Sequence, residues 1–143
     1  MPEQVIKERA RRLLREGKRP TTAAGEFVRE EIEHVRHGQH GARSTKQAIA
    51  IGLSKARRAG VPLKPPAKGQ TSERTRRSAE SAYEVGQGKR RPRKPSRRRA
   101  LAATGALKRE RHLGVVSRKA LSTQAKRAAA QRRRRKRPGA RRR

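Results

Sequence analysis

The strongest signal for ordered structure is the stretch GARSTKQAIAIGLSKARRAGVPLKPP, residues 41–66, which combines a helix start, an apolar face and a helix stop. A hydroxyl of Ser44 or Thr45 can cap the first turn, because a side-chain oxygen at this position accepts a hydrogen bond from a free backbone N–H. Gly60 and the proline two residues later supply the left-handed residue and the break that end a helix. The stretch therefore predicts a helix over residues 45–59.

The two faces of this predicted helix differ in chemistry. Successive residues lie about 100° apart, which gathers the apolar and small residues on one side and the cations on the other. The small residues would let a second helix approach closely, and a homodimer through this face is one way for a small core to gain buried area. An ordinary amphipathic surface helix explains the same pattern. The apolar face holds Ala48, Ile49, Gly52, Leu53, Ala56 and Ala59, and the cationic side holds Lys46, Lys55, Arg57 and Arg58.

Composition restricts the partners of the protein. The chain has 43 Lys and Arg against 11 acidic residues, all Glu, for a formal charge of +32 in 143 residues. A charge of this size favours a polyanionic partner. Val, Ile, Leu and Phe together make up about 14% of the residues, below the roughly 20% at which a highly charged chain is expected to be disordered. One core that spans the whole chain is therefore not expected.

Three regions follow from the distribution of apolar residues, prolines and charge. Residues 1–63 hold most of the apolar residues and are expected to form a small helical head. Residues 64–95 are rich in Pro and Gly and are interpreted as a linker with at most one short helix, over residues 71–85. Residues 96–143 form an Arg- and Ala-rich tail, and residues 86–143 carry 24 cations and one glutamate.

The expected fold class is mostly α, with about three short helices in the head and a largely disordered cationic C-terminal arm that contains nascent helices. The first helix is predicted over residues 3–16 and the third over residues 45–59. The second begins at a cap on Thr21 or Thr22 and ends at Gly38. Its glutamates are expected to pair with Lys or Arg of the third helix; they are Glu26, Glu30, Glu31 and Glu33.

The tail repeats one local pattern of the head. SRRRAL at Ser96 and SRKAL at Ser117 resemble STKQAI at Ser44, since each has a capping serine followed by cations and then Ala with Leu or Ile. The abundance of Ser, Arg and Ala in this chain explains the same likeness. Their apolar faces are rich in Ala, so we expect a coil that becomes partly helical once nucleic acid neutralises its charge.

Sequence-nonspecific binding of nucleic acid is the expected function, through contacts of Arg and Lys with phosphates. The only aromatic residues are Phe27 and Tyr83, too few for a surface that stacks unpaired bases. Arg outnumbers Lys in the last third of the chain. Because Arg binds phosphate bidentately and can enter a narrow minor groove, duplex DNA is favoured over RNA. Two alternatives stay open: an RNA- or ribosome-associated protein, and an adaptor whose head binds another protein while the tail anchors it. The candidate nucleic-acid-binding residues are Lys46, Lys55, Arg57, Arg58, Arg97, Arg98, Arg99, Lys108, Arg109, Arg118, Lys119, Lys126, Arg127, Arg132, Arg133, Arg134, Arg135, Lys136 and Arg137.

Other function classes find little support in the sequence. The chain has no Cys, no Asp and no Gly-rich phosphate loop, so we expect no enzyme, no catalytic residue and no cofactor. Glu31 and His34 have the E-x-x-H spacing of helical metal sites, but such sites use a second pair of this kind and none is present, so no metal is expected. No membrane partner is expected either, because no apolar stretch approaches the length of a membrane span.

Residues 26–66, EFVREEIEHVRHGQHGARSTKQAIAIGLSKARRAGVPLKPP, resemble the core of a family of small basic bacterial proteins. The most specific part is KQAIAIGLSKARRAG, and the later segment SRKALSTQAKRAAA is similar to the cationic C-terminal segment of longer members. The family is a domain of unknown function, and some members are labelled as DNA-binding or plasmid-stabilisation proteins. The resemblance covers about two thirds of the chain. It implies a bacterial cytoplasmic protein with a DNA association, which we expect at the nucleoid, and it carries over no set of binding residues.

Overall fold

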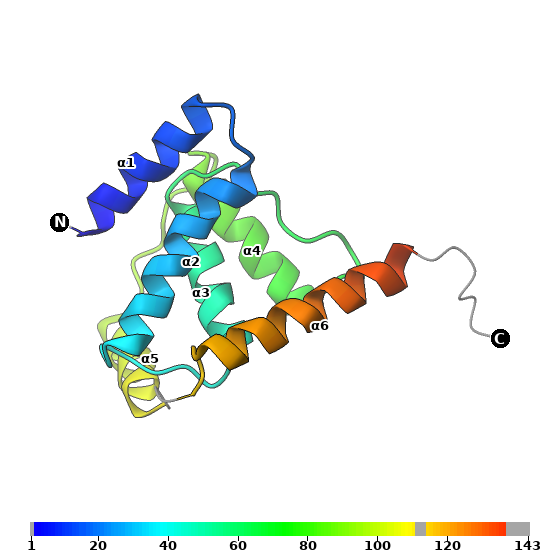
Figure 1. Cartoon of the computed structure of the whole chain (residues 1–143). Helices are drawn as coiled ribbons and strands as arrows, with labels where there is room; N and C mark the ends of the chain where they lie inside the picture. The colour runs from blue at the N-terminus through cyan, green and yellow to red at the C-terminus, as the bar shows by residue number, and fades with distance from the viewer. Residues whose placement is uncertain (1, 111–113, 137–143) are drawn as a thin grey trace.

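The computed structural model describes residues 2–110 and 114–136, and all regular structure in this part of the chain is α-helical (Figure 1). Six helices follow one another along these described residues, and the longest connection lies between the third and the fourth. They are α1 (Pro2–Arg15), α2 (Pro20–Arg36), α3 (Thr45–Arg58), α4 (Glu73–Gly86), α5 (Arg97–Arg109) and α6 (Arg118–Lys136).

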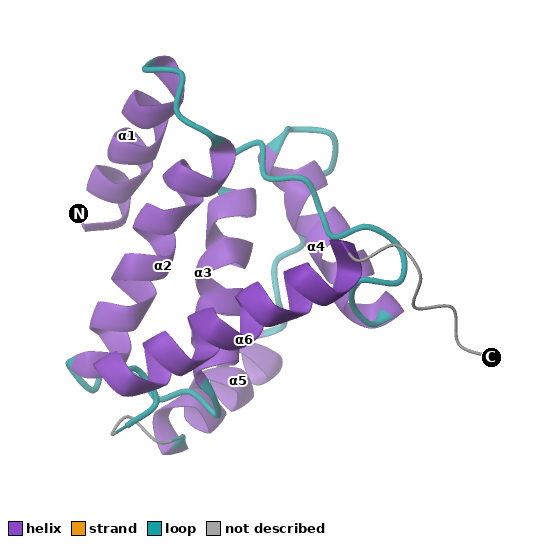
Figure 2. Cartoon of the chain, turned by 45° about the vertical axis from the view of Figure 1, so that its right-hand side comes forward, coloured by secondary structure: helices purple, strands orange, loops and turns teal. Residues whose placement is uncertain are grey.

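Helix α3 is the centre of the fold, because α2, α4 and α6 all pack against it, while α1 packs against α2 (Figures 1 and 2). It begins at Ser44, whose hydroxyl oxygen accepts a hydrogen bond from the backbone N–H of Gln47 at 3.2 Å. It ends before Gly60, which adopts a positive φ of 96°. The predicted cap and stop of this helix are therefore both confirmed.

Helices α2 and α3 lie close together, because small residues of α3 face α2 where the two helices cross. Ala48, Gly52 and Ala56 are buried on α3. A Cβ atom at Gly52 would lie 2.7 Å from the Cα atom of Val28 on α2, so only glycine fits at this position. The small-residue face of α3, which the sequence offered for a homodimer, is thus covered by α2 of the same chain.

The start of α2 differs from the prediction. Pro20 occupies the first turn and Arg19 is the N-cap, with no side-chain hydrogen bond to the helix. Proline is favoured there because its fixed φ suits a helix and its missing N–H would have no partner in the first turn. Thr21 and Thr22 therefore lie inside the helix, and Pro20 rather than a capping hydroxyl determines where the helix begins.

Two apolar clusters hold the helices together. The first joins α1, α2 and α3 around Phe27, which is 1% exposed. The second joins α2 and α3 to the residues just before α6. The buried members of the first cluster are Ala10, Ala23, Ala24, Phe27, Ala56 and Val61, and those of the second are Val35, Ala42, Ala48 and Val116.

Helix α4 begins two residues later than the short helix predicted over residues 71–85 and packs on α3. The contact is closest at Gly86, where a Cβ atom would overlap the backbone carbonyl oxygen of Arg57. The side-chain amide of Gln87 donates a hydrogen bond to the carbonyl oxygen of Gly60 at 3.3 Å. The sequence stretch between head and tail thus contributes a packed helix.

The prediction of a largely disordered C-terminal arm is wrong. Helices α5 and α6 continue the fold to Lys136, and their first turns are capped by Ser96 and Ser117, which accept hydrogen bonds from backbone N–H groups at 3.3 Å and 3.2 Å. The side chain of Val116 is 3% exposed in the second apolar cluster. Local capping, the high helix propensity of Ala, Leu, Arg and Lys, and this anchor together offset the repulsion between cations.

Candidate nucleic-acid interface

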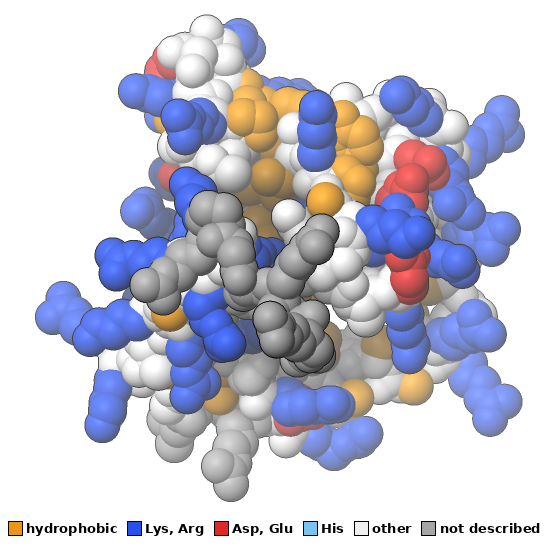
Figure 3. All heavy atoms as spheres, turned by 90° about the vertical axis from the view of Figure 1, so that its right-hand side faces the viewer, with side chains coloured by type: hydrophobic (Ala, Val, Ile, Leu, Met, Phe, Trp, Pro, Cys, Tyr) orange, Lys and Arg blue, Asp and Glu red, His pale blue; other side chains and the backbone are white. Residues whose placement is uncertain are grey.

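Helix α6 presents a dense cationic surface. Its 19 residues include nine Lys and Arg and no acidic residue. All nine side chains are exposed, and none of the residues of α6 is buried. The helix lies across one side of the molecule (Figure 2). On the face drawn in Figure 3, Lys and Arg side chains are spread widely and acidic side chains form a few small groups.

Two contacts hold α6 in place at its ends. Just before the helix, Thr45 donates a side-chain hydrogen bond to the backbone carbonyl of Val115. Near its C-terminal end, the guanidinium of Arg135 donates to the carbonyl oxygen of Gln70 at 3.0 Å. The nine cations are therefore displayed on a helix attached to the folded head.

A groove of about 550 Å³ lies between the first turns of α3 and α6. Three cations line it: Lys46 from α3, and Lys119 and Arg127 from α6. Both helices begin here, so the positive ends of their dipoles add to the cationic side chains. The groove unites candidate residues from the head and from the tail, which the sequence could not place relative to one another.

A second basic hollow was not found from the sequence. It lies between the C-terminal part of α3, α4 and the segment before α5, and its cations are Arg58, Arg90, Arg91 and Arg93. Arg90 is 3.5 Å from Glu84. Arg90, Arg91 and Arg93 belong to the block GKRRPRKPS, whose high density of cations is visible in the sequence. The position of this block beside Arg58 depends on the packing of α4.

Two candidate residues of the head are engaged inside the molecule. The ammonium of Lys55 lies 2.8 Å from Oε2 of Glu31. Arg57 donates to the carbonyl oxygens of Leu63 at 3.2 Å and Lys64 at 3.5 Å, and burial lowers the pKa of Arg57 from its ordinary value. Lys46 and Arg58 are exposed and remain accessible to phosphate.

The candidate residues of the tail are exposed wherever the structure describes them. On α5 these are Arg97, Arg98, Arg99, Lys108 and Arg109. Helix α5 lies at the end of the molecule near the turn between α2 and α3, and the backbone N–H of Gly41 donates to the carbonyl oxygen of Leu107 at 2.8 Å. Arg137 falls outside the described residues.

The glutamates of α2 pair differently from the prediction. Only Glu31 meets a cation of α3, while Glu33 pairs with Arg36 of its own helix at 3.0 Å and Glu30 lies 3.9 Å from His34. Local pairs at i, i+3 and i+4 form because these side chains share one face of a helix. The acidic charge of α2 is thus used mostly within α2.

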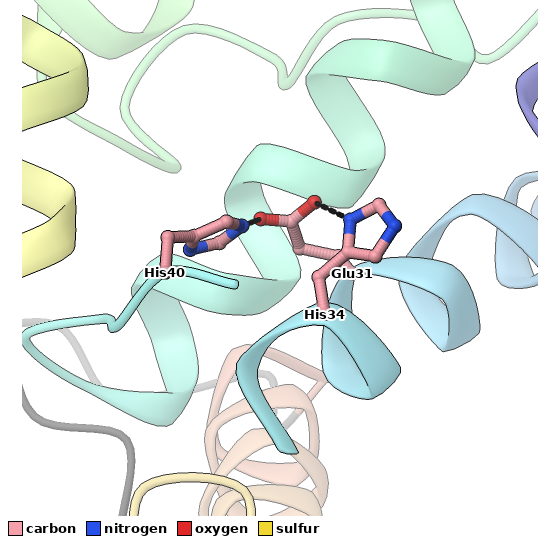
Figure 4. Close-up of side chains that lie close together, drawn as sticks. All are labelled: Glu31, His34 and His40. Carbon is pink, nitrogen blue, oxygen red and sulfur yellow. Dashed lines mark ion pairs between the residues drawn. The ribbon is translucent and has the colours of Figure 1, made fainter. Parts of the chain in front are cut away.

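Glu31 stands at the centre of a separate polar cluster, drawn in Figure 4. Its carboxylate is fully buried, and the ring nitrogens of His34 and His40 lie 3.8 Å and 2.8 Å from its two oxygens. His40 comes from the turn after α2. The E-x-x-H pair of Glu31 and His34 was not expected to bind metal, because the sequence has no second pair of this kind. In the structure a turn, and not a second helical pair, supplies the third group, His40.

The fold and these surfaces define the protein as a strongly basic, all-helical chain over its described residues. In that part no helix has the length and apolar composition needed to cross a bilayer. The model of a family of unknown function (DUF6496) matches residues 15–68. No curated protein and no solved structure matches the chain. The matched segment overlaps the resemblance noted over residues 26–66, and it comprises α2, α3 and their connections.

Proposed function

We propose that the protein binds duplex DNA without sequence specificity, as a non-catalytic bacterial protein of the nucleoid, and that α6 with the groove of Lys46, Lys119 and Arg127 is its main contact surface. The observation that carries the proposal is the exposed, acid-free set of nine cations on α6. Each cation that neutralises a phosphate releases condensed counterions, which favours binding whatever the base sequence.

The shape of α6 favours duplex DNA over duplex RNA. A helix of 19 residues is roughly 28 Å long, and with its side chains about 10–12 Å wide, close to the width of the major groove of B-DNA. The major groove of duplex RNA is too narrow to admit such an element. The positions of the aromatic residues argue against single strands, because Phe27 is buried and Tyr83 is half-buried on α4.

The test is a salt titration of binding to duplex DNA, single-stranded DNA and structured RNA of equal length. We expect the steepest dependence and the tightest binding with the DNA duplex. Changing Arg132, Arg133, Arg134 and Lys136 of α6 to glutamine removes four candidate phosphate contacts and keeps Arg135, whose guanidinium holds the helix on Gln70. The log-log salt slope on duplex DNA should become shallower by about 3.6, and affinity near physiological salt should fall on the order of 100-fold or more.

A matched variant separates local contacts from net charge. Arg9, Arg11, Arg12 and Arg15 on α1 are also exposed, and their change to glutamine removes the same charge far from α6 (Figure 1). This variant should keep most of the affinity and nearly all of the salt slope. Equal losses of DNA affinity in the two variants would mean that α6 is not the main contact surface. A clear preference for structured RNA would instead support the RNA- or ribosome-associated alternative.

A further inference from the structure

We propose that Glu31, His34 and His40 form a binding site for one divalent transition-metal ion, with Zn²⁺ as the best match. Each residue offers one ligand atom, and the three atoms lie within 4.8 Å of one another. Two imidazoles and one carboxylate are a ligand set that zinc uses, with water in the fourth position. The side chains of His34 and His40 are 24% and 18% exposed, so an ion can reach the site from solvent.

The spacing of the ligand atoms suits a tetrahedral ion. Zinc bonds to nitrogen and oxygen are about 2.0–2.2 Å long, which places neighbouring ligand atoms about 3.3–3.5 Å apart. Nε2 of His40 lies 2.8 Å from Oε1 of Glu31, and all three ligand atoms lie within 4.8 Å of one another. The required spacing falls inside this range, so small side-chain rotations bring the ligand atoms to a tetrahedral arrangement.

The hydrogen bonding of His40 leaves a place for a cation. Nδ1 of His40 is 2.9 Å from the carbonyl oxygen of Gly41, which can only accept, so Nδ1 carries the proton of the neutral ring. Nε2 then holds a lone pair beside Oε1 of Glu31. Although the two atoms are close, they are not aligned as a hydrogen bond, and Oε1 is a buried oxygen with no donor within the described chain.

The surroundings also supply the outer contacts that metal-binding histidines require. Such a histidine normally presents its second ring nitrogen to a carbonyl or carboxylate, which fixes the tautomer. His40 has the carbonyl of Gly41, and Nε2 of His34 faces Oε1 of Glu30 at 3.9 Å. Lys55 holds the other oxygen of Glu31 at 2.8 Å, so Oε1 is the one free to bind the ion.

A metal at this position would join separate elements of the fold. Glu31 and His34 lie on α2, while His40 lies in the turn that leads to α3. Zinc would therefore stabilise the folded state over the unfolded chain, in which these groups are not brought together. At a free zinc concentration about 100 times the dissociation constant, the midpoint of thermal unfolding should rise by about 5–10 °C.

The test uses the full chain, freed of metal by a chelator and of nucleic acid by high salt, because phosphates also bind metal. Thermal unfolding is followed by circular dichroism with and without ZnCl₂, and Co²⁺ is added separately to look for the visible absorption of a tetrahedral site. We expect a 1:1 complex and the stabilisation given above. His34→Ala and His40→Ala should each lower zinc affinity by 10-fold or more and remove the Co²⁺ absorption.

His37→Ala is the matched control, because His37 lies at the same end of α2 with a side chain that is 69% exposed, outside the cluster. It should keep the zinc response of the unmodified chain. Glu31→Gln is a further variant, and the two histidine variants decide the outcome if it does not fold. The proposal would be overturned if zinc did not stabilise the unmodified chain, or if zinc still stabilised both histidine variants.

Discussion

Helices α2 and α6 are similar in length and opposite in use. Five of the 17 residues of α2 are buried and the helix carries four glutamates against two arginines. None of the 19 residues of α6 is buried, and all nine of its charged residues are cations. The stability of α2 comes from tertiary packing, whereas α6 depends on its cap, on helix propensity and on a few anchors beside it. In these two helices, the residues that pack the fold and those that carry the positive charge are therefore largely separate.

The largest effect on stability should come from Phe27→Ala, which removes a buried aromatic ring from the packed helix α2. Phe27 is 1% exposed and lies between α1, α2 and α3. Loss of a buried aromatic ring costs about 3–5 kcal/mol of unfolding free energy, which urea denaturation can measure. Leu121→Ala on the half-buried side of α6 is the counterpart and should cost clearly less. Equal losses would mean that α6 belongs to the core as fully as α2 does.

A pair of glycines, one on the packed helix α3 and one on α5, which has no buried residue, gives smaller effects of opposite sign. Alanine at Gly52 would meet the backbone of Val28 and push α2 from α3, at a cost of about 1–3 kcal/mol. At Gly105 on α5 the nearest atom to a new Cβ is the end of the Arg109 side chain, 3.7 Å away. Gly105→Ala should therefore stabilise the chain by up to about 1 kcal/mol. Thermal unfolding of both variants checks the prediction, and destabilisation by Gly105→Ala would mean that α5 is packed more tightly than described.

The smallest effect concerns the cap of α6. Ser117→Ala removes the acceptor for the backbone N–H of Ala120 and should cost about 1 kcal/mol of helix stability. Because few other contacts hold α6, circular dichroism should show a loss of helix before global unfolding. The same change at Ser44, which caps the packed helix α3, should lower global stability without a separate transition. Identical unfolding curves for the two variants would argue against the distinction between the regions.

Local signals in the sequence were sufficient to predict that the head has three helices and where α3 begins and ends, but not how α2 begins. The apolar stripe, the cap at Ser44 and the stop at Gly60 place α3 almost to the residue, because all three act within a few residues of the chain. The serines at 96 and 117 were also recognised as caps. Disorder of the tail was nevertheless predicted, since composition counts few apolar residues and does not reveal that Val116 reaches a cluster built from α2 and α3.

The candidate sites depended more strongly on tertiary structure. Pairs between the glutamates of α2 and the cations of α3 were predicted, yet Lys55 was also assigned to nucleic acid. Its partner Glu31 lies 24 positions earlier, and which glutamate meets which cation depends on the α2–α3 contact. His40 joins Glu31 and His34 only because the turn after α2 folds back. The nearness of Lys46 to Lys119 and Arg127 likewise follows from the seating of α6. Sequence patterns identified the kinds of side chain, and packing determined which of them meet.

The close approach of Gly86 to Arg57 has a consequence for evolution. The family model matches residues 15–68 and so ends before α4. Because a side chain at Gly86 would collide with the backbone of α3, a descendant chain that lost this glycine could not dock its fourth helix in the same way. The residue at this one position would therefore distinguish relatives that share the larger helical arrangement from those that inherited the matched segment alone.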